Sequence, residues 1–454
     1  MFRNSLSALS KAKAFGSCAS SSSSVSPLAS KFHLVVLQSF IGETRRNFSS
    51  DTISKSSSSG SSIASFIKDS KLNADQKQQL NALLKSSELG GKVLKYKLNE
   101  LNINYSNLEM GSRNHIVAGV DANGNVLGFD HVTLDTLWVK KSSETSTLTD
   151  PSTLEQIPLV KRNFTVSAGR DKDIESALVQ ESTKDTDIVF ARGDSNYGII
   201  LSFVEEGDSN TAAINQQMGM EHIGSLGSVL AHSLNVEYDK RVVAVIEGHT
   251  SLQQEVVGIL QEEYAQYQVL DGSFCNFKEA KTVYQRPEPG NYFVIYKEGE
   301  IVAGAKFVAP QDLNILNCGD VTLDRVMAFS QVFGFKRTHY SKESFRSLKF
   351  DHLYAKPGHE DDLWTLMRVV ASRFSPNLHW IQIVGDERDS NWLRYLGANS
   401  DKKQQPSSKF LGSFGFYSPK GIEVHAKTYG IDSAIADKIK NGPLMFPSDV
   451  AFLK

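Results

Sequence analysis

Apolar runs joined by short polar turns mark two hairpins in the chain. Their paired apolar runs lie at 115–120 and 126–134, and at 292–296 and 301–308. The first pair is joined by Asn123 and Gly124, and an Asn-Gly turn between two apolar runs is a strong hairpin signature. Each return strand also contains a glycine, Gly128 or Gly304. A glycine inside a strand often indicates a bulge or the close approach of another backbone.

The same plan follows each hairpin. Segments 164–174 and 352–363 both predict a strand, a glycine turn and a helix with acidic residues in its first turn. The second helix has apolar residues on one face, at Leu363, Leu366, Met367, Val370 and Phe374. An apolar strand is then predicted at 187–190 and at 379–384. The tripeptide Asp-Ser-Asn follows each of these strands, as 194–196 and as 389–391, where Asp389 or Ser390 would cap a helix.

These features predict a duplicated domain. Three pairs recur in the same order, Gly128 with Gly304, Gly169 with Gly358, and Ser195 with Ser390, at offsets of 176, 189 and 195 residues. The alternative is two unrelated α/β domains that share common hairpins. The predicted domains are 63–238 and 239–430, followed by a C-terminal extension, 431–454.

The remaining periodic segments complete the two predicted domains. Helical spacing covers 63–84 in two pieces, and Asn73 is the N-cap of the second piece. A strand is expected at 241–246 and a helix at 252–267. The segment 412–426 predicts a closing hairpin around a Ser-Pro-Lys-Gly turn. Gly224 to Gly227 indicates either a turn between the halves or a glycine-rich turn that opens a helix.

Composition narrows the classes of protein. The chain has 454 residues, 40% of them apolar, with 49 basic and 51 acidic residues. A net charge of -2 argues against broad nucleic-acid binding, and no long apolar stretch predicts a membrane-spanning helix. The three cysteines, Cys18, Cys275 and Cys318, are too few for a disulfide framework or a metal cluster. We therefore expect neither nucleic acid, membrane nor metal as a partner.

The N-terminus differs from the rest in charge. Residues 1–48 contain six basic residues and one acid, so the remaining chain has 43 basic and 50 acidic residues. A basic, Ser-rich segment ending in Arg45-Arg46-Asn47-Phe48-Ser49 resembles a mitochondrial transit peptide and its cleavage pattern. We expect import into the mitochondrial matrix, with a plastid as the alternative destination. Residues 49–62 are a predicted Ser-rich linker.

The order of elements resembles that of the GNAT superfamily of N-acetyltransferases. The hairpin at 292–308, the strand-turn-helix around Gly358 and the segment 391–398 carry this resemblance, which covers 240–430 well and 65–235 more faintly. It implies an α/β (α+β) fold of two tandem GNAT-like domains, each a mixed central sheet flanked by helices. It also implies that an acyl group passes from acetyl-CoA or another acyl-CoA, a co-substrate, to an amine of a small molecule or protein.

The resemblance also implies which residues form the site. Tyr395, on the late helix, would protonate the departing thiolate, and His352 would deprotonate the amine. Core packing for Tyr395 and an ordinary hydrogen-bonded position for His352 are the alternatives. Backbone N–H groups at a helix N-terminus would hold the pyrophosphate of the donor. The donor-binding candidates are Tyr354, Lys356, Gly358 and Asn391 in the second copy and Gly169 and Arg170 in the first.

The sequence departs from the GNAT pattern at the pyrophosphate loop. After Gly358 come Glu360, Asp361 and Asp362, whose charges would repel an anion, and each copy has one loop glycine. The alternative function is therefore a catalytically inactive GNAT-like protein that binds a ligand or partner. Ion pairs across the loop in both copies would favour this alternative. The oligomeric state does not follow from the sequence.

Overall fold

The computed structural model describes most of the chain beyond residue 61. The described residues are 62–68, 71–90, 94–98, 114–141, 151–192, 195–232, 239–245, 250–271, 292–318, 345–373, 380–396 and 415–446. The predicted transit peptide lies outside them, as does the predicted linker except for Ser62. All structural statements below concern the described residues.

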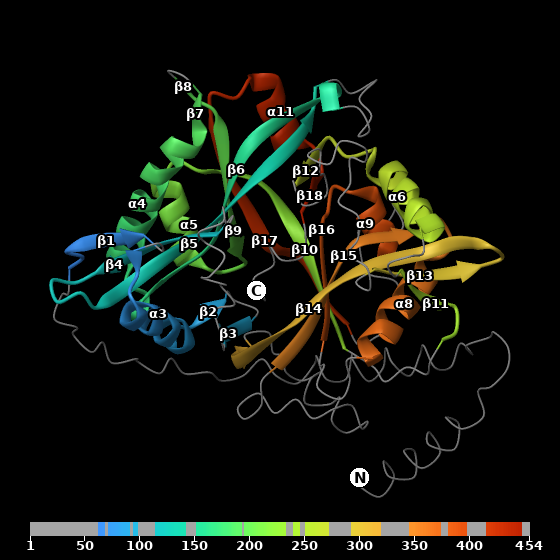
Figure 1. Ribbon diagram of the computed structural model, residues 1–454, viewed down its shortest axis with the longest axis horizontal. Coiled ribbons are helices and arrows are strands. Elements are labelled where there is room, and N and C mark those ends of the chain that lie inside the picture. Colours follow the sequence, from blue (N-terminus) through green and yellow to red (C-terminus); the bar gives the residue numbers. More distant parts are fainter. Residues whose placement is uncertain are drawn as a thin grey trace, which may run out of the picture. The chain divides into compact units, whose positions relative to one another are not determined.

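One continuous mixed sheet runs through the described part of the chain (Figure 1). Its strands follow one another in the order β1 (Ser65–Lys68), β4 (Asn114–Val120), β5 (Val126–Lys140), β6 (Leu154–Ser167), β9 (Gly198–Glu205), β17 (Gly415–Tyr429), β10 (Glu221–His232), β16 (Trp380–Asp386), β15 (Phe345–Ala355), β14 (Glu300–Cys318), β13 (Tyr292–Lys297) and β11 (Val242–Val245). Two neighbouring pairs along this path, β6 with β9 and β15 with β16, are parallel, and the others are antiparallel.

The sheet order is symmetric about its centre. Counted from either end, the strands come in corresponding chain order, so that β1, β4, β5, β6 and β9 match β11, β13, β14, β15 and β16. The two central strands are exchanged: β17 comes from the C-terminal half but pairs with β9, and β10 comes from the N-terminal half but pairs with β16. This arrangement is a mixed α/β fold of two similar halves. The two halves contribute strands to one shared sheet instead of forming a separate sheet each.

The helices repeat in the same order in each half. They are α3 (Ala74–Ser86), α4 (Lys172–Phe190) and α5 (Ser209–Gln217), then α6 (Thr250–Tyr264), α8 (Glu360–Arg373) and α9 (Ser390–Tyr395), with α11 (Ser433–Asn441) after β17. Asn73 caps α3 through a capping box with Gln76, as the sequence predicts. Four short strands, β2 (Leu89–Gly90), β3 (Leu94–Leu98), β12 (Val269–Asp271) and β18 (Leu444–Met445), pair off the main path. A separate ladder joins β7 (Ala191–Arg192) to β8 (Ser195–Asn196).

In the second half, α6 and α8 cover opposite faces of the sheet. Alternate residues of β13 show this, because Phe293 and Ile295 share a buried cluster with α8, whereas Tyr292 and Val294 share one with α6. The apolar face predicted for the α8 segment is confirmed by four of its five residues, which are buried in that cluster: Leu363, Leu366, Met367 and Val370. Phe374 lies outside the described residues.

Both predicted hairpins are confirmed, as β4–β5 and β13–β14. Their strand glycines do mark close approaches. A Cβ on Gly128 would lie 2.7 Å from the Val166 carbonyl oxygen, and a Cβ on Gly304 would lie 2.6 Å from the Tyr292 hydroxyl. Any side chain at these positions would therefore collide with a neighbouring strand.

The first-half helix is longer than the sequence predicts. The segment 187–190, predicted as a strand, is the last turn of α4, and the strand follows only at β9. The tripeptide at 194–196 is therefore not the counterpart of the tripeptide at 389–391 in the second half. Instead Asp208-Ser209-Asn210 follows β9 and Asp208 caps α5, just as Asp389 caps α9. The correct offset is 181 residues, and the correspondence between the halves becomes closer.

Three other predicted elements are wrong, because tertiary pairing overrides local signals. The first piece of the helix predicted at 63–84 contains β1 instead. Gly224 and Gly227 lie inside β10 and form neither a turn nor a helix start. The closing hairpin predicted at 412–426 is the single long strand β17, and its Ser-Pro-Lys-Gly segment is an irregularity opposite Leu226 and Ser228 of β10.

Candidate functional site

The parallel strands of each half separate after a few residues. The β15–β16 ladder covers only Ser347–Lys349 against Trp380–Gln382, and the β6–β9 ladder ends at Arg162 and Ser202. Beyond these pairs, 350–355 of β15 and 383–386 of β16 share no ladder pair among the described residues. Along these segments the two strands therefore do not bond to each other, and side chains reach the Leu353 and Ala355 carbonyl oxygens instead.

A bulge precedes each glycine turn at the same distance. His352 and Leu353 lie opposite the single residue Ala305, and Asn163 is the extra residue between β6 and β5. Both His352 and Asn163 come six residues before the turn glycine, Gly358 or Gly169. His352 has a φ of 50°, in the left-handed region that non-glycine residues adopt rarely. A bulge at this place bends the strand next to the separation.

Tyr395 reaches the separating strands from α9. Its hydroxyl donates a hydrogen bond to Glu263 Oε1 at 2.5 Å and lies 3.4 Å from the Leu353 carbonyl oxygen of β15. Burial raises the pKa of Glu263, and the hydrogen bond from Tyr395 partly opposes this rise. Burial and the charge of Glu263 raise the pKa of Tyr395. The pair therefore combines a neutral phenol with a carboxylate that binds a proton more readily than usual.

A second tyrosine–carboxylate pair lies on the same two elements. The Tyr267 hydroxyl, just beyond α6, donates to Asp389 Oδ2. Asp389 also accepts from the backbone N–H groups of Asn391 and Trp392 as the N-cap of α9. Burial raises the pKa of Asp389, whereas these hydrogen bonds lower it. This pair fixes the end of α6 against the start of α9 and so positions Tyr395.

Arg394 connects α9 to the glycine turn. Its Nη1 donates to the Ala355 carbonyl oxygen at 2.6 Å and to Glu360 Oε1 at 3.0 Å. Its Nη2 donates to Asn391 Oδ1 at 3.1 Å. The same Glu360 oxygen accepts from the Gly358 N–H at 3.1 Å. The carboxylate of Glu360 thus already binds an N–H group of the turn, where the GNAT resemblance places an anionic phosphate.

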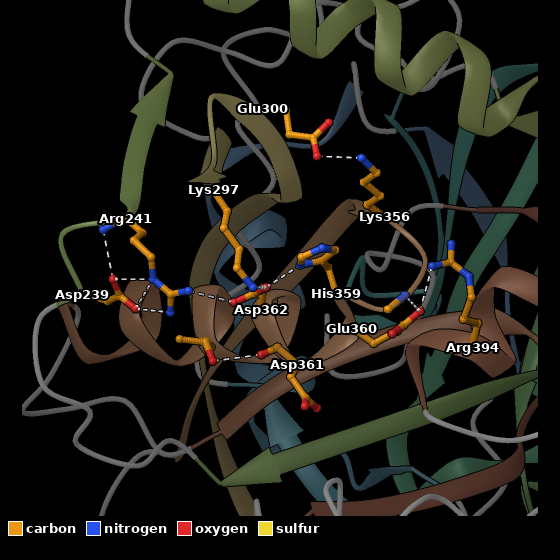
Figure 2. A network of polar contacts seen from close by, with 12 residues as sticks. Asp239, Arg241, Lys297, Glu300, Lys356, His359, Glu360, Asp361, Asp362 and Arg394 are labelled. Atoms are coloured by element: carbon orange, nitrogen blue, oxygen red, sulfur yellow. Dashed lines mark hydrogen bonds and ion pairs between the residues drawn. The ribbon is translucent and has the colours of Figure 1, made fainter. Parts of the chain in front are cut away.

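Basic side chains also surround Asp362, another acid of this turn (Figure 2). Asp362 is 3.1 Å from Arg241 and 2.8 Å from His359 Nδ1, with Lys297 at 4.0 Å. Lys356 pairs with Glu300 at 2.6 Å, but both side chains are largely exposed, so the pair contributes little stability. Of the three acids predicted to repel an anion, Glu360 and Asp362 are therefore paired with cations of the same half.

The first half has a similar but simpler turn. Gly169 has a φ of 71°, and Arg170 pairs with Glu175 at 3.1 Å and with Asp208 at 3.5 Å. Asp171 accepts from two N–H groups of the first turn of α4. No tyrosine corresponds to Tyr395, because the residue at the same distance from the cap of α5 is Ile214, which is buried.

The predicted site residues fall into two groups. In the second half, Arg394 links Asn391 with the Gly358 turn, and Tyr395 is the next residue. Gly169 and Arg170 form the separate first-half turn. Tyr354 is half-buried on β15 and packs against the cluster that includes α6.

His352 is buried beside Tyr264, with ring centroids 6.2 Å apart, and burial lowers the pKa of His352 to about 3. Such an imidazole is neutral at pH 7 but is too weak a base to take a proton from an amine effectively. The structure therefore does not support His352 as the general base.

The sequence reasoning missed Glu263 and Arg394. Glu263 belongs to a helix far from Tyr395 in the chain, and no local motif surrounds it. Arg394 lies inside the segment that carries the GNAT resemblance, but only its contacts with Glu360 and Ala355 reveal its role. Both residues become recognisable only when α6, α8 and α9 are placed against β15.

No helix of the described residues is long and apolar enough to cross a bilayer. No group of three or more His, Cys, Asp or Glu residues in them has an arrangement that could hold a metal ion.

The chain is similar in fold to known acyltransferases. No protein-family model matches it, and no curated protein sequence matches it. Among solved structures, it is similar to Saccharomyces cerevisiae N-myristoyltransferase with bound myristoyl-CoA and inhibitors, at 12% identity and a TM-score of 0.45, over 90% of this chain and 97% of that chain. A GCN5-related N-acetyltransferase from Sphaerobacter thermophilus has 10% identity and a TM-score of 0.42, over 81% and 97% of the two chains.

A smaller protein matches part of the chain. Arabidopsis thaliana NAA60, in complex with a bisubstrate analogue, has 15% identity and a TM-score of 0.24, over 37% of this chain and 88% of that one. These comparisons describe the arrangement of elements.

Proposed function

We propose that the protein is a CoA-dependent N-acyltransferase with an acyl-CoA donor and an amine acceptor. The observation that carries this proposal is the Tyr395–Glu263 pair at the separation of β15 and β16. A phenol and a carboxylate with a raised pKa, 2.5 Å apart, form an acid–base pair where β15 and β16 separate. Acyl transfer to an amine needs one group that accepts a proton and one that donates a proton.

The proton transfers balance on these two residues. The amine nitrogen forms a bond to the thioester carbonyl carbon, and the carbon–sulfur bond breaks. Glu263 accepts the proton that the amine loses, and the Tyr395 hydroxyl gives its proton to the departing sulfur. Because the two side chains are hydrogen-bonded, the proton on Glu263 then restores the Tyr395 hydroxyl. No covalent intermediate on the protein is needed, in contrast to nucleophilic catalysis.

Donor binding in the second half requires a rearrangement at Glu360. Its carboxylate accepts from the Gly358 N–H, and Arg394 binds both Glu360 and the Ala355 carbonyl oxygen. A phosphate would have to displace Glu360, after which Arg394 could pair with the phosphate instead. Lys356 lies at the same turn and is largely exposed, so it could also contact an anion.

The ion pairs at both turns favour a second candidate function. In each half an acid that could repel the donor is instead bound by an arginine, Arg394 or Arg170. A protein that no longer bound acyl-CoA would have no need for open turns. The second candidate is therefore a catalytically inactive protein of the same fold that binds a ligand or partner.

We place this activity in the mitochondrial matrix, with a plastid as the alternative. The support is the basic, acid-poor segment 1–48 and its cleavage pattern. The test is to fuse residues 1–60 to a fluorescent reporter and to determine which organelle imports it. Cytosolic fluorescence would contradict both destinations.

Thermal unfolding with CoA compounds separates the two candidate functions. The mature chain, 49–454, would be melted alone and with acetyl-CoA, myristoyl-CoA, desulfo-CoA or ATP. A ligand that binds only the folded state adds about 2.7 kcal/mol at a hundredfold excess over its dissociation constant. A rise in the midpoint with CoA compounds but not with ATP supports the transferase. Turnover with a panel of amines that is lost in Tyr395→Phe would establish the transferase. If millimolar CoA does not raise the melting midpoint, the catalytically inactive binding protein is the candidate that remains.

A further inference from the structure

The centre of the sheet contains buried polar atoms without hydrogen bonds. Gln382 of β16 is fully buried, yet neither its side-chain oxygen nor its nitrogen has a hydrogen-bond partner. The hydroxyl of Ser228 on β10 is also buried and without a partner. In contrast, Gln76, the other buried glutamine of the described residues, uses both side-chain atoms. Buried polar groups are usually paired, so the two central residues require an explanation.

Both side chains lie on one face of the sheet. Ile381 and Ile383 pack into the α8 cluster, whereas Val384 belongs to the cluster on the opposite face, so Gln382 shares the face of Val384. Ser228 is the register partner of Val384 and therefore lies on this face as well. Through Lys349, the partner of Gln382 in the last ladder pair, the same face continues across β15 and β14 toward α6.

These atoms lie where the parallel strands begin to separate. Gln382 belongs to the last β15–β16 ladder pair, and Tyr395 binds the Leu353 carbonyl further along the same strand β15. The charged residues on this face of β14 and β15 are Lys306, Lys349 and Asp351. Lys349 and Asp351 both have interactions of their own. Lys306 lies close enough to His352 for its charge to lower the pKa of that imidazole. On β10 and β16, the buried side-chain groups without partners on this face are the amide of Gln382 and the hydroxyl of Ser228.

We infer that Gln382 and Ser228 are specificity-determining residues that bind an uncharged carboxamide or peptide group of the acceptor. A primary amide offers one acceptor and two donor positions, and a carboxamide offers the complementary set. An alkyl chain would leave both protein groups unpaired, and a carboxylate would offer only acceptors. The inference rests on the proposed acyltransferase function, because it assigns the acceptor to the separation of the two strands.

The inference predicts an unusual combination of stability and activity. Leaving a buried polar group unpaired is unfavourable, whereas an apolar residue of the same shape carries no such penalty. Gln382→Met should therefore unfold at the same temperature as the wild type or a higher one. Gln76→Met is the matched control and should unfold at a lower temperature, because both the oxygen and the nitrogen of its wild-type amide are hydrogen-bonded. Ser228→Ala should behave like Gln382→Met.

The activity test compares two acceptors of equal length. One is an amino acid amide such as glycinamide, and the other is an alkylamine without the amide. The wild type should prefer the amide by about tenfold in kcat/KM, the ratio that one modest hydrogen bond provides. Gln382→Met should lose this preference through a higher KM for glycinamide, with the KM for acyl-CoA unchanged. A purely structural role would alter the two acceptors equally.

The outcomes separate this inference from the proposed function. If no acyl-CoA supports turnover but calorimetry shows a dipeptide amide that binds wild type and not Gln382→Met, the transferase fails and the binding site stands. If Gln382→Met melts lower by as much as Gln76→Met, its amide has partners in the free protein and the inference is overturned. Unchanged acceptor preference in an active Gln382→Met variant, or no binding of the dipeptide amide by an inactive wild type, would overturn it as well.

Discussion

Removing the hydroxyl of Tyr395 tests the acid–base pair directly. Tyr395→Phe keeps the ring packing but deprives Glu263 of its 2.5 Å hydrogen bond. The Glu263 side chain is only 14% exposed, and Nη2 of Arg394, a cation, lies 3.6 Å from its Oε1 atom. A hydrogen bond to a charged group contributes about 1.5–3 kcal/mol, so we expect a loss of about 2 kcal/mol in unfolding free energy at pH 7.

A double-mutant cycle separates the energy of the Tyr395–Glu263 hydrogen bond from the loss of packing. Glu263→Gln, Tyr395→Phe and the double variant would be unfolded in urea, with tryptophan fluorescence as the signal. Trp364 is a local probe because its indole N–H donates to the Tyr395 carbonyl oxygen at 2.8 Å. We expect a coupling energy of about 1.5–3 kcal/mol. A coupling below about 0.5 kcal/mol would refute the pair, since independent sites are additive within that range.

The pH dependence gives a second check with a defined sign. Burial raises the pKa of Glu263 above its unfolded value, so stability is greatest at low pH and is lost as pH rises through the folded pKa. The Tyr395 hydrogen bond lowers this pKa, and Tyr395→Phe should therefore steepen the loss. Below the unfolded pKa the bond is between neutral groups and contributes roughly 1 kcal/mol. A Tyr395→Phe defect that is equal at pH 4 and pH 7 would contradict a charged Glu263.

Three further predictions concern the turn, the core and the bulge. Glu360→Ala frees the Gly358 N–H and Arg394, so CoA should raise the melting temperature more than in wild type, and no gain would exclude Glu360 as a competitor for phosphate. Gly385→Ala places a Cβ 2.4 Å from the Trp392 ring and should lower stability by about 1–3 kcal/mol. Its control, Gly258→Ala, has open space in α6 and should raise stability by up to about 1 kcal/mol, with both measured by urea unfolding. Because burial lowers the pKa of His352 to about 3, its contribution to stability is complete above its unfolded pKa and is lost as pH falls toward 3. His352→Asn, which also tolerates its φ of 50°, should flatten this acid-side loss in pH-dependent unfolding curves, and an unchanged slope would show that other groups cause it.

Local patterns predicted those elements whose signals lie within a few residues. The Asn-Gly turn between apolar runs specified the first hairpin, and Asn73 specified the start of α3. The Gly358 turn and the apolar face of α8 followed from spacing alone. Elements stabilised by distant partners were missed. Gly224 and Gly227 lie in β10 because β16 and β17 pair with it on both sides, and β17 runs through a Ser-Pro-Lys-Gly sequence for the same reason.

The sequence also contains a repeated tripeptide, Asp-Ser-Asn, and only the structure shows which copies correspond between the two halves. Asp194-Ser195-Asn196 and Asp208-Ser209-Asn210 are identical tripeptides. Ser195 and Asn196 form β8, whereas Asp208 caps α5. The apolar residues at 187–190 suit either a strand or the end of a helix, since a short run has no decisive period. Contact with the sheet decided in favour of α4 and moved the equivalent strand to β9.

By itself, the sequence determined the hairpins and the two glycine turns, because hydrogen bonding and apolar periodicity within short segments are sufficient for these. Tyr395 became a candidate through the GNAT resemblance. Only the tertiary structure decided the exchange of β10 and β17, the pairing of Glu263 with Tyr395 and the unpaired amide of Gln382. Each of these joins or isolates groups from distant parts of the chain. Their distances and burial depend on how the sheet closes around them, which no local pattern encodes.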